Sequence, residues 1–575
     1  MNHRTSPVKH GRKVLPARRP QRLLPFSLLL LAAALALPPA AVSEGAERPV
    51  SDAQPGEASV TANESSTAAD RLAGEINARL AEVWRREAIV PAKRTGSDVF
   101  FRRVHLDLIG RIPSASAASR FAAIDSPAER RRLVQELAAS AASAEHRSRF
   151  LRTTWFPQTS VDPYQYLAPD TERWIASQLK KRLPLNQIAR ELVAGSRNST
   201  PRTFVESNDH RSAQMAGNAV GAFLGVDLSC AQCHDHPQAK WTQDQFWQTA
   251  AFFERAPDDQ EFALDQLSIA IPDTERSVQA ALFTGESWQA QPLAASSSAQ
   301  PSATASAPDR SGRALFAEWM SGPANPFFAR RLANEFWSEF FGRPLTTALD
   351  GSTAGDPELE ALLDGIAAAL VASDFDSRLL IEAYALTDAY QLSSETASET
   401  ASETASETEP GAPAAINSAS GRYFERAAVR GLTGEQLFDS LDTAAGRLVV
   451  REDLDAPARI QERQRFREQF RIASNSRPQR SILQSLGLMN GDLTARLVSA
   501  EENATIAALA STPFMDEAAC VESLFWAVLS RAPREEEIRR LQEAGLSVEE
   551  RPTRARRYGQ LFWLLVNTVE FNTNH

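Results

Sequence analysis

Hydrophobic residues recur at helical spacing in both halves of the chain. In the N-terminal half, Leu72, Ile76, Leu80 and Trp84 follow one another every four residues, and a similar stripe runs from Leu359 to Leu370 in the C-terminal half. Residues three and four apart share one face of an α-helix, so both patterns predict amphipathic helices. No stretch sustains a two-residue alternation, and Gly is scarce at 26 residues. The chain is therefore predicted to be mainly α.

The helical pattern breaks in the middle of the chain. Residues 290–312 are rich in Ser, Ala and Pro, which is typical of a linker. Residues 256–289 have no clear period, although a short strand or two is expected around Leu267 to Ile271. We therefore expect two helical domains, 67–255 and 313–571, joined by an irregular segment and linker at 256–312.

Two further segments are too polar to form a core. Residues 44–66 are rich in Glu, Ser, Ala and Pro and are predicted to be disordered, with order beginning near Thr67. From Ser394 the chain repeats a Ser-Glu-Thr pattern, in which no apolar side chain is larger than Ala. We expect a disordered insertion at 394–418 inside the second domain.

The first 43 residues have the pattern of a secretory signal peptide. Seven Lys and Arg residues and no Asp or Glu accompany an apolar run from Leu23 to Leu37, and Ala41-Val42-Ser43 supplies small residues for cleavage. The run of about 15 residues is short for the ~20 that a membrane-spanning helix needs. We expect an exported protein, periplasmic or on the cell surface, which contacts the membrane only if this segment is retained.

Charge and cysteine content exclude two classes of protein. The formal net charge is −10, and it is more negative without the basic first 43 residues. Nucleic-acid binding needs clustered positive charge, so no nucleic-acid partner is expected. With three cysteines in 575 residues, the chain is not a disulfide-dense scaffold.

One motif carries recognisable chemistry, the run from Cys230 to Pro237 that reads Cys-Ala-Gln-Cys-His-Asp-His-Pro. Cys-x-x-Cys-His is the attachment spacing of c-type haem. Cys230 and Cys233 would bond the porphyrin, and His234 would supply the proximal bond to iron. On this interpretation the cofactor is haem c, and the partner is an unidentified redox protein.

Three other interpretations of the motif stay open. The two cysteines could form a small-loop disulfide, because the exported compartment is oxidising. They could bind zinc together with His234 and His236, although a second Cys-x-x-Cys is absent. They could also be reduced and buried, with no cofactor at all. We expect the motif at a turn between a helix that ends near Leu228 and one that begins at Thr242, with both thiols and the imidazole facing a partly enclosed space.

The surroundings of the motif allow two interpretations. Aromatic residues crowd it on both sides, and they could line a haem pocket or form ordinary core: Phe223, Trp241, Phe246, Trp247, Phe252 and Phe253. Thr242 and Gln245 form a capping-box pattern for the helix that follows. Elsewhere, His105 and Asp107 lie beside Arg102 and Arg103. They could contribute a polar site or make structural ion pairs.

Several segments together resemble a known family. The motif with Phe223 to Val226 before it and Trp241 to Phe253 after it is similar to the secreted, paired domains of unknown function found in planctomycetes, the planctomycete cytochrome-associated (PSCyt-type) family. The run from Arg102 to Gly110 resembles the first domain of that family. Segments that resemble its second domain are Asn325 to Arg330, Phe341 to Arg343, Ala389 to Ser394 and Tyr423 to Ser440.

The resemblance covers most of residues 70–571 but implies little about activity. Two functions remain: an exported redox protein with one c-type haem, or a cell-surface interaction or scaffold protein in polymer degradation. In the second, the motif from Cys230 to His236 would be a disulfide or metal site, and the partner would be a cell-surface protein. The sequence does not decide whether the protein is an enzyme.

Overall fold

The computed structural model describes part of the chain by residue. The described residues are 57–195, 200–254, 267–285, 311–350, 353, 355–394, 421–450, 457–470, 482–544 and 551–575. The predicted signal peptide at 1–43 lies outside them. So do residues 44–56 of the predicted N-terminal disordered segment, most of the linker, and the predicted insertion beyond Ser394.

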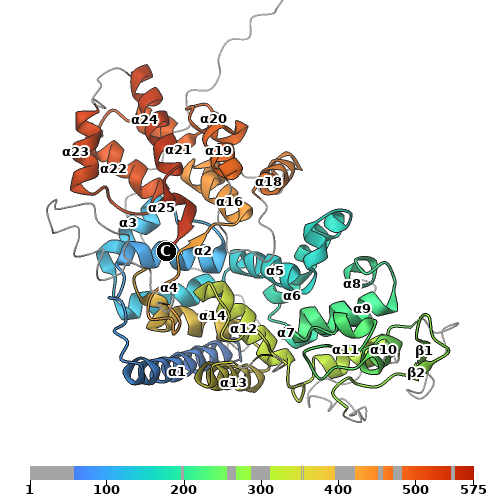
Figure 1. Ribbon diagram of the computed structural model, residues 1–575. Helices are drawn as coiled ribbons and strands as arrows, with labels where there is room; N and C mark the ends of the chain where they lie inside the picture. The colour runs from blue at the N-terminus through green and yellow to red at the C-terminus, as the bar shows by residue number, and fades with distance from the viewer. Residues whose placement is uncertain are drawn as a thin grey trace, which may run out of the picture. The chain divides into compact units, whose positions relative to one another are not determined.

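The described chain is mainly helical, as predicted (Figure 1). The helices up to residue 254 are α1 (Glu57–Arg86), α2 (Ser97–Ile109), α3 (Ala115–Ile124), α4 (Pro127–Ala139), α5 (Ala141–Trp155), α6 (Ala168–Lys180), α7 (Leu185–Ala194), α8 (Thr203–Glu206), α9 (Ser212–Asn218) and α10 (Gln243–Ala251). Shorter turns of 3-10 or π-helix are η1 (Pro157–Ser160), η2 (Tyr164–Leu167), η3 (Ala219–Leu224) and η4 (Ser229–Gln232).

The helices after the linker continue the same pattern. They are α11 (Gly312–Met320), α12 (Phe328–Phe341), α13 (Pro357–Ala372), α14 (Ser377–Leu386), the 3-10 turn η6 (Ala389–Gln391), α16 (Gly434–Ala444), α17 (Arg447–Val450), α18 (Pro457–Gln469), α19 (Ile482–Asn490), α20 (Asp492–Leu497), α21 (Ala504–Ser511), α22 (Glu517–Val528), α23 (Glu535–Glu543), α24 (Arg551–Val566) and α25 (Val569–Asn572). Two antiparallel ribbons pair β1 (Ser268–Ala270) with β2 (Ser277–Gln279) and β3 (Arg430–Gly431) with β4 (Thr573–Asn574).

Local sequence explains several of these boundaries. Asp356 caps α13 by accepting a hydrogen bond from the backbone N–H of Glu358 at 3.0 Å, and Pro357 takes the first helical position, where a missing N–H costs nothing. Thr242 and Gln245 form the expected capping box at the start of α10. The short strands expected around Leu267 to Ile271 are present as the β1–β2 hairpin.

The start of the first helix differs from the sequence prediction. Order was expected near Thr67, but α1 begins at Glu57. The residues from Glu57 to Ser66 include two Ala and two Glu, which favour helix. The disordered segment predicted at residues 44–66 stays a prediction.

Buried hydrophobic residues form two clusters, and the linker does not separate them. The first cluster runs from Ala69 through α14 to Phe424, so it includes residues on both sides of the linker. Phe252 and Phe253, before the linker, contact the ring of Phe316 after it at centroid distances of 5.8 and 5.0 Å. Apart from Leu106 and Ile112, the second cluster lies between Leu432 and Phe571, on helices drawn in orange to red in Figure 1. The predicted domain limits therefore stay a prediction. A polar linker shows which segment of the chain is not packed, but it does not show which helices pack against one another.

Helix α2 contributes to both clusters. Phe100 and Val104 belong to the first cluster, whereas Leu106 belongs to the second. Arg102, on the same helix, donates to the backbone oxygen of Phe571 at 2.8 Å. Arg103 donates to the backbone oxygen of Leu392 at 3.0 Å. This helix therefore joins the two cores through hydrophobic contacts and through side-chain hydrogen bonds.

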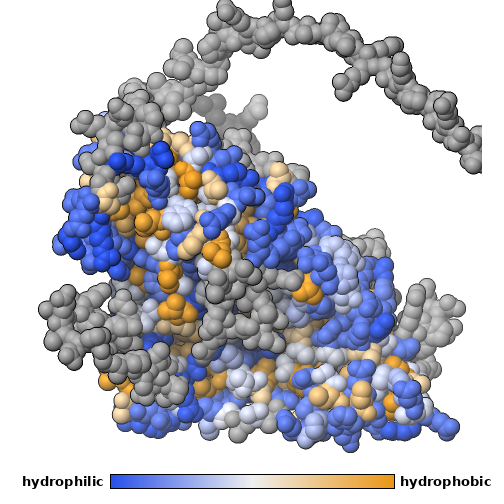
Figure 2. Space-filling view, turned by 45° about the horizontal axis from the view of Figure 1, so that its top comes forward, coloured by the Kyte–Doolittle hydropathy of each residue, from blue (hydrophilic) through white to orange (hydrophobic). Residues whose placement is uncertain are grey.

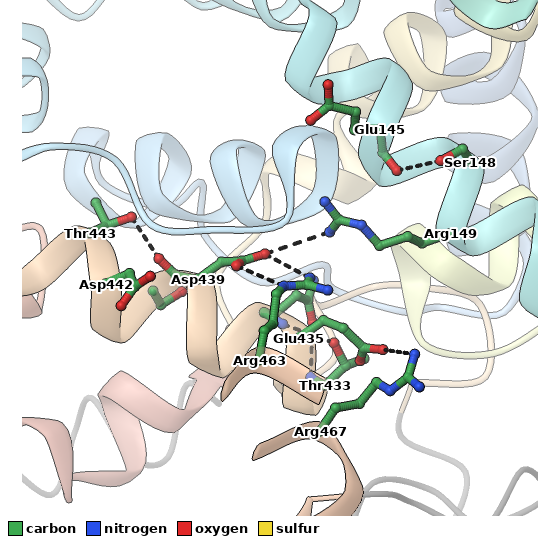
Figure 3. A network of polar contacts seen from close by, with 12 residues as sticks. Glu145, Ser148, Arg149, Thr433, Glu435, Asp439, Asp442, Thr443, Arg463 and Arg467 are labelled. Atoms are coloured by element: carbon green, nitrogen blue, oxygen red, sulfur yellow. Dashed lines mark hydrogen bonds and ion pairs between the residues drawn. The ribbon is translucent and has the colours of Figure 1, made fainter. Parts of the chain in front are cut away.

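A second polar connection lies between α5 and α16 (Figure 3). Asp439 of α16 accepts two hydrogen bonds from Arg463 of α18, at 3.0 and 2.8 Å, and lies 3.6 Å from the guanidinium of Arg149 on α5. Burial alone would raise the pKa of Asp439, but the neighbouring arginines outweigh it and lower that pKa to about 2. The carboxylate is therefore charged and acts as a fixed link between the cores.

The surface drawn in Figure 2 is mostly hydrophilic, with hydrophobic residues in separate patches. Single large hydrophobic side chains such as Phe514 and Val569 are highly exposed, which is common at the surface of folded proteins. Among the helices described, none combines the length and the apolar character that crossing a membrane requires.

Candidate functional site

The Cys-x-x-Cys-His motif lies on the connection between the π-helical turn η3 and helix α10. η3 ends at Leu224, and Gly225 follows with a φ of +70°. The helix before the motif therefore ends four residues earlier than Leu228, since glycine adopts this left-handed conformation without strain. The next helix begins at Gln243 with Thr242 as its cap, as expected.

The three haem-attachment candidates are exposed. Cys230, Cys233 and His234 lie at the surface, and both thiols are free. We expected these three side chains to face a partly enclosed space, but in this structure they lie on an open surface. The intervening Ala231 is fully buried and belongs to the first hydrophobic cluster, so it holds the turn against the protein while its neighbours point outward.

Helix α10 fixes the backbone of this loop. The Trp247 indole donates to the backbone oxygen of Gln232 at 3.0 Å, and the Gln243 side chain donates to the backbone oxygen of Cys233 at 2.9 Å. Asp235 accepts a hydrogen bond from the backbone N–H of Gln243 at 2.8 Å. The middle of the motif is thus attached to the first two turns of one helix, and the thiols lie exposed on this loop.

Sequence analysis missed the anchoring role of Gln243 and Trp247. Trp247 was considered as a pocket wall or core residue, and Gln243 was not singled out. The available signal was the capping box, because it places Gln243 at the first helical position, next to the chain that enters the helix. The hydrogen-bond partners, however, depend on the path of the loop, which the sequence does not specify.

The aromatic residues around the motif form ordinary core. Trp241, Phe246 and Trp247 are at most 5% exposed. Phe223 stacks on Trp155 with ring centroids 5.4 Å apart. These rings pack into the protein beneath the loop, whereas the thiols lie on its outer side.

The two histidines of the motif differ in hydrogen bonding. The Nδ1 of His234 lies 2.8 Å from the backbone oxygen of Asp235, so it carries a proton and donates it. In the neutral ring, the Nε2 of His234 then carries no proton, and its lone pair is free to bind a metal. The Nδ1 of His236 accepts from the backbone N–H groups of Gln238 at 3.1 Å and Ala239 at 2.9 Å. The proton of His236 is then on Nε2, which leaves that ring without a nitrogen free to bind a metal.

A metal cluster is not preassembled in the described chain. Among the residues that the structure describes, no group of three or more His, Cys, Asp or Glu side chains is placed to hold a metal ion. Together with the acceptor role of His236, this arrangement disfavours a zinc site built from both histidines and both cysteines. The His234–His236 metal site stays a prediction for a rearranged loop.

The second candidate site, around His105 and Asp107, has a structural explanation. The Asp107 carboxylate is 1% exposed and lies 2.8 Å from Arg430, and it accepts hydrogen bonds from Tyr390 at 2.7 Å and Asn574 at 2.8 Å. His105 lies 2.8 Å from the backbone oxygen of Phe101, and burial lowers its pKa to about 4. Each polar group has a partner from the fold itself, which favours the interpretation as structural contacts.

Two family models match separate parts of the chain. The family model PSCyt2, a protein of unknown function (DUF1549), matches residues 75–258. The family model PSD1, a protein of unknown function (DUF1553), matches residues 312–482. Searches of curated proteins and of solved structures found no match. The chain therefore belongs to the planctomycete cytochrome-associated family, in which these two domains of unknown function occur as a pair.

Proposed function

We propose that this chain is an exported protein that binds one c-type haem on the exposed loop and exchanges electrons with a redox protein. Cys230 and Cys233 would form the thioether bonds, and His234 would bind the iron. The observation that carries the proposal is the hydrogen bond from Nδ1 of His234 to the backbone oxygen of Asp235.

That hydrogen bond prepares His234 for metal binding. A histidine that binds a metal through one ring nitrogen usually donates the other N–H to a carbonyl or carboxylate, which fixes the tautomer and orients the ring. His234 has this arrangement, and its free nitrogen belongs to an exposed side chain. The haem would supply a one-electron redox couple at this position.

The cysteines also fit covalent attachment. Thioether formation requires free thiols that a porphyrin can approach, and Cys230 and Cys233 are both free and exposed. The fixed backbone of the loop holds the two residues at a constant separation. The signal-peptide pattern of residues 1–43 supports the proposal too, because haem attachment to this motif in bacteria follows export.

A second candidate function rests on the same exposure. A porphyrin is mostly apolar and is usually surrounded by apolar side chains, whereas the aromatic residues near this motif are buried beneath the loop. The alternative is therefore a cell-surface interaction or scaffold protein in polymer degradation, with the two cysteines as a disulfide or a zinc site and without haem.

The deciding experiment uses the full-length chain produced in a bacterium that attaches haem to exported proteins. The haem proposal predicts a Soret band, and it predicts haem that stays with the protein under denaturing electrophoresis. Cys230→Ser and Cys233→Ser should each weaken the attachment, and His234→Ala should change the iron spectrum. His236→Ala is the matched control, which should keep the wild-type spectrum.

A haem-free wild type would overturn the proposal. If mass spectrometry then finds Cys230 and Cys233 bonded to each other, or one zinc ion per chain, the scaffold function remains. A His236→Ala variant that alters the iron spectrum as much as His234→Ala would contradict the assigned roles of the two rings.

A further inference from the structure

A cleft at the start of α2 lies away from the cysteine motif. It has a volume of about 900 Å³, which is enough for a small organic molecule. One wall is formed by residues 90–99, ahead of and within the first turn of α2, together with Ser393 and Arg426. The other wall comes from Trp526 on α22 and from residues 531–534. Trp526 packs against the first hydrophobic core, and its neighbour Phe525 on α22 belongs to the second.

The cleft is positively charged, although the chain as a whole is acidic. Five cationic and three acidic side chains line it, in a chain of net charge −10. The cations are Lys93, Arg94, Arg426, Arg531 and Arg534, and the acids are Asp98, Glu425 and Glu570. A local excess of positive charge on an acidic protein attracts an anionic ligand to this position in particular.

Most of the acidic side chains already have partners. Glu570 pairs with Arg531 at 2.6 Å. Glu425 accepts a hydrogen bond from the backbone N–H of Tyr423 at 3.1 Å. Asp98 turns back toward Gly96, at the first turn of α2, where the helix dipole stabilises a carboxylate.

Two of the cations have no such partner. In the part of the chain that the structure describes, neither Lys93 nor Arg426 makes a side-chain hydrogen bond or an ion pair. Arg534 forms no ion pair there within 4.0 Å, although its charge helps to lower the pKa of Glu537. Arg94 donates a hydrogen bond to the neutral side chain of Gln391. Among the described residues, the cleft thus contains positive charge without an acidic partner.

Apolar surface accompanies the charge. Val90 is 89% exposed at the cleft, and the partly buried Trp526 lines the opposite wall. Binding sites for small organic ligands combine such apolar surface with a few polar groups that fix orientation.

We propose that this cleft binds a small organic anion, whose carboxylate, phosphate or sulfate group contacts Lys93 and Arg426 and whose apolar part lies against Trp526 and Val90. This site is independent of the proposed haem. Its ligand would stabilise the folded protein, since any ligand that binds only the folded state does so.

Isothermal titration of the purified full-length protein tests the proposal. The probes are phenyl phosphate, phenyl sulfate and benzoate, which differ in the anionic group, with acetate and benzyl alcohol as controls that lack the ring or the charge. We expect at least one aromatic anion to bind with an affinity that falls as salt is added, and more tightly than either control. The order of the three anions then identifies the anionic group.

The variants locate the binding. Lys93→Gln and Arg426→Gln should each weaken the tightest probe by about tenfold, because each removes a charged hydrogen bond. Lys181→Gln and Arg79→Gln are the matched controls, which remove exposed charges elsewhere and should leave affinity unchanged. The melting temperature of each variant without ligand reports whether it is folded. Benzyl alcohol binding as tightly as the anions, no binding of any anion, or equal losses in the control variants would each overturn the proposal.

Discussion

The network around α2 and the loop after Leu228 use polar side chains in opposite ways. Around α2, the carboxylate of Asp107 is almost completely buried and has three side-chain partners from distant parts of the chain. In the loop, Cys230, Cys233 and His234 are exposed, and α10 holds the loop through hydrogen bonds to the backbone oxygens of Gln232 and Cys233.

This difference distinguishes polar side chains that stabilise the fold from side chains that are candidates for a functional site. A buried charge without a partner is costly, so a fully partnered one is explained by folding alone. An exposed reactive group on a loop with a fixed backbone is not needed for folding. Substitutions should therefore affect stability strongly in the α2 network and much less in the loop.

The largest effect is expected for Asp107→Asn. The substitution leaves the buried Arg430 without its counter-charge, and such a loss typically destabilises a protein by about 3–5 kcal/mol. Denaturant unfolding followed by circular dichroism measures the change. Asp70→Asn is the control, because Asp70 pairs with Arg131 at the surface, where an ion pair contributes about 0–1 kcal/mol. Equal losses in the two variants would contradict the comparison.

A smaller effect, visible as a pH dependence, is expected for Asp439. Its pKa is about 2 in the folded protein and close to 3.8 when unpaired, so the folded state gains stability above the higher value. That gain is lost as the pH falls from about 4 to about 2, and it amounts to about 2 kcal/mol.

Asp439→Asn should remove this part of the pH dependence. We expect the stability difference between wild type and variant to shrink by about 2 kcal/mol from pH 5 to pH 2. Denaturant unfolding over this range measures the difference. A constant difference would show that Arg463 and Arg149 do not depress the pKa in solution.

Much of the fold could be predicted from the sequence because helices leave a local periodic pattern. The stripe from Leu359 to Leu370 predicted α13, and Thr242 with Gln245 predicted the start of α10. The grouping of helices into cores could not be predicted in this way. Leu106 and Val104 are neighbours on α2 but belong to different cores, and only the long-range contacts decide which.

The candidate site was found from residue types and spacing, but its environment was not. The spacing of Cys230, Cys233 and His234 is visible in the sequence, and so is the crowd of aromatic residues. Which side of the loop those rings occupy depends on the turn at Gly225 and on hydrogen bonds from α10. The different tautomers of His234 and His236 are also set by backbone groups that a sequence pattern does not contain.

Trp247→Phe tests the fixed backbone of the loop. The variant keeps most of the buried ring but loses the hydrogen bond to the backbone oxygen of Gln232, which should cost about 1 kcal/mol. Hydrogen exchange should show faster opening of the loop amides. If the haem proposal is correct, covalent attachment should become less efficient, although both cysteines are unchanged. Trp241→Phe, which loses a hydrogen bond to Asp350 instead, is the control for a general loss of stability.

The smallest effects separate the two histidines of the motif. His236→Ala removes an acceptor for two backbone N–H groups and should destabilise the protein by about 1 kcal/mol, because the freed groups lie in a partly buried turn. His234→Ala removes one hydrogen bond of an exposed ring that accepts nothing from the backbone, so its effect should stay within about 0.5 kcal/mol. Unfolding of both haem-free variants measures this difference without any assumption about the cofactor. If His234→Ala proved the more destabilising of the two, His234 would have a structural role. Its tautomer would then no longer support the proposal that it is the residue that binds iron.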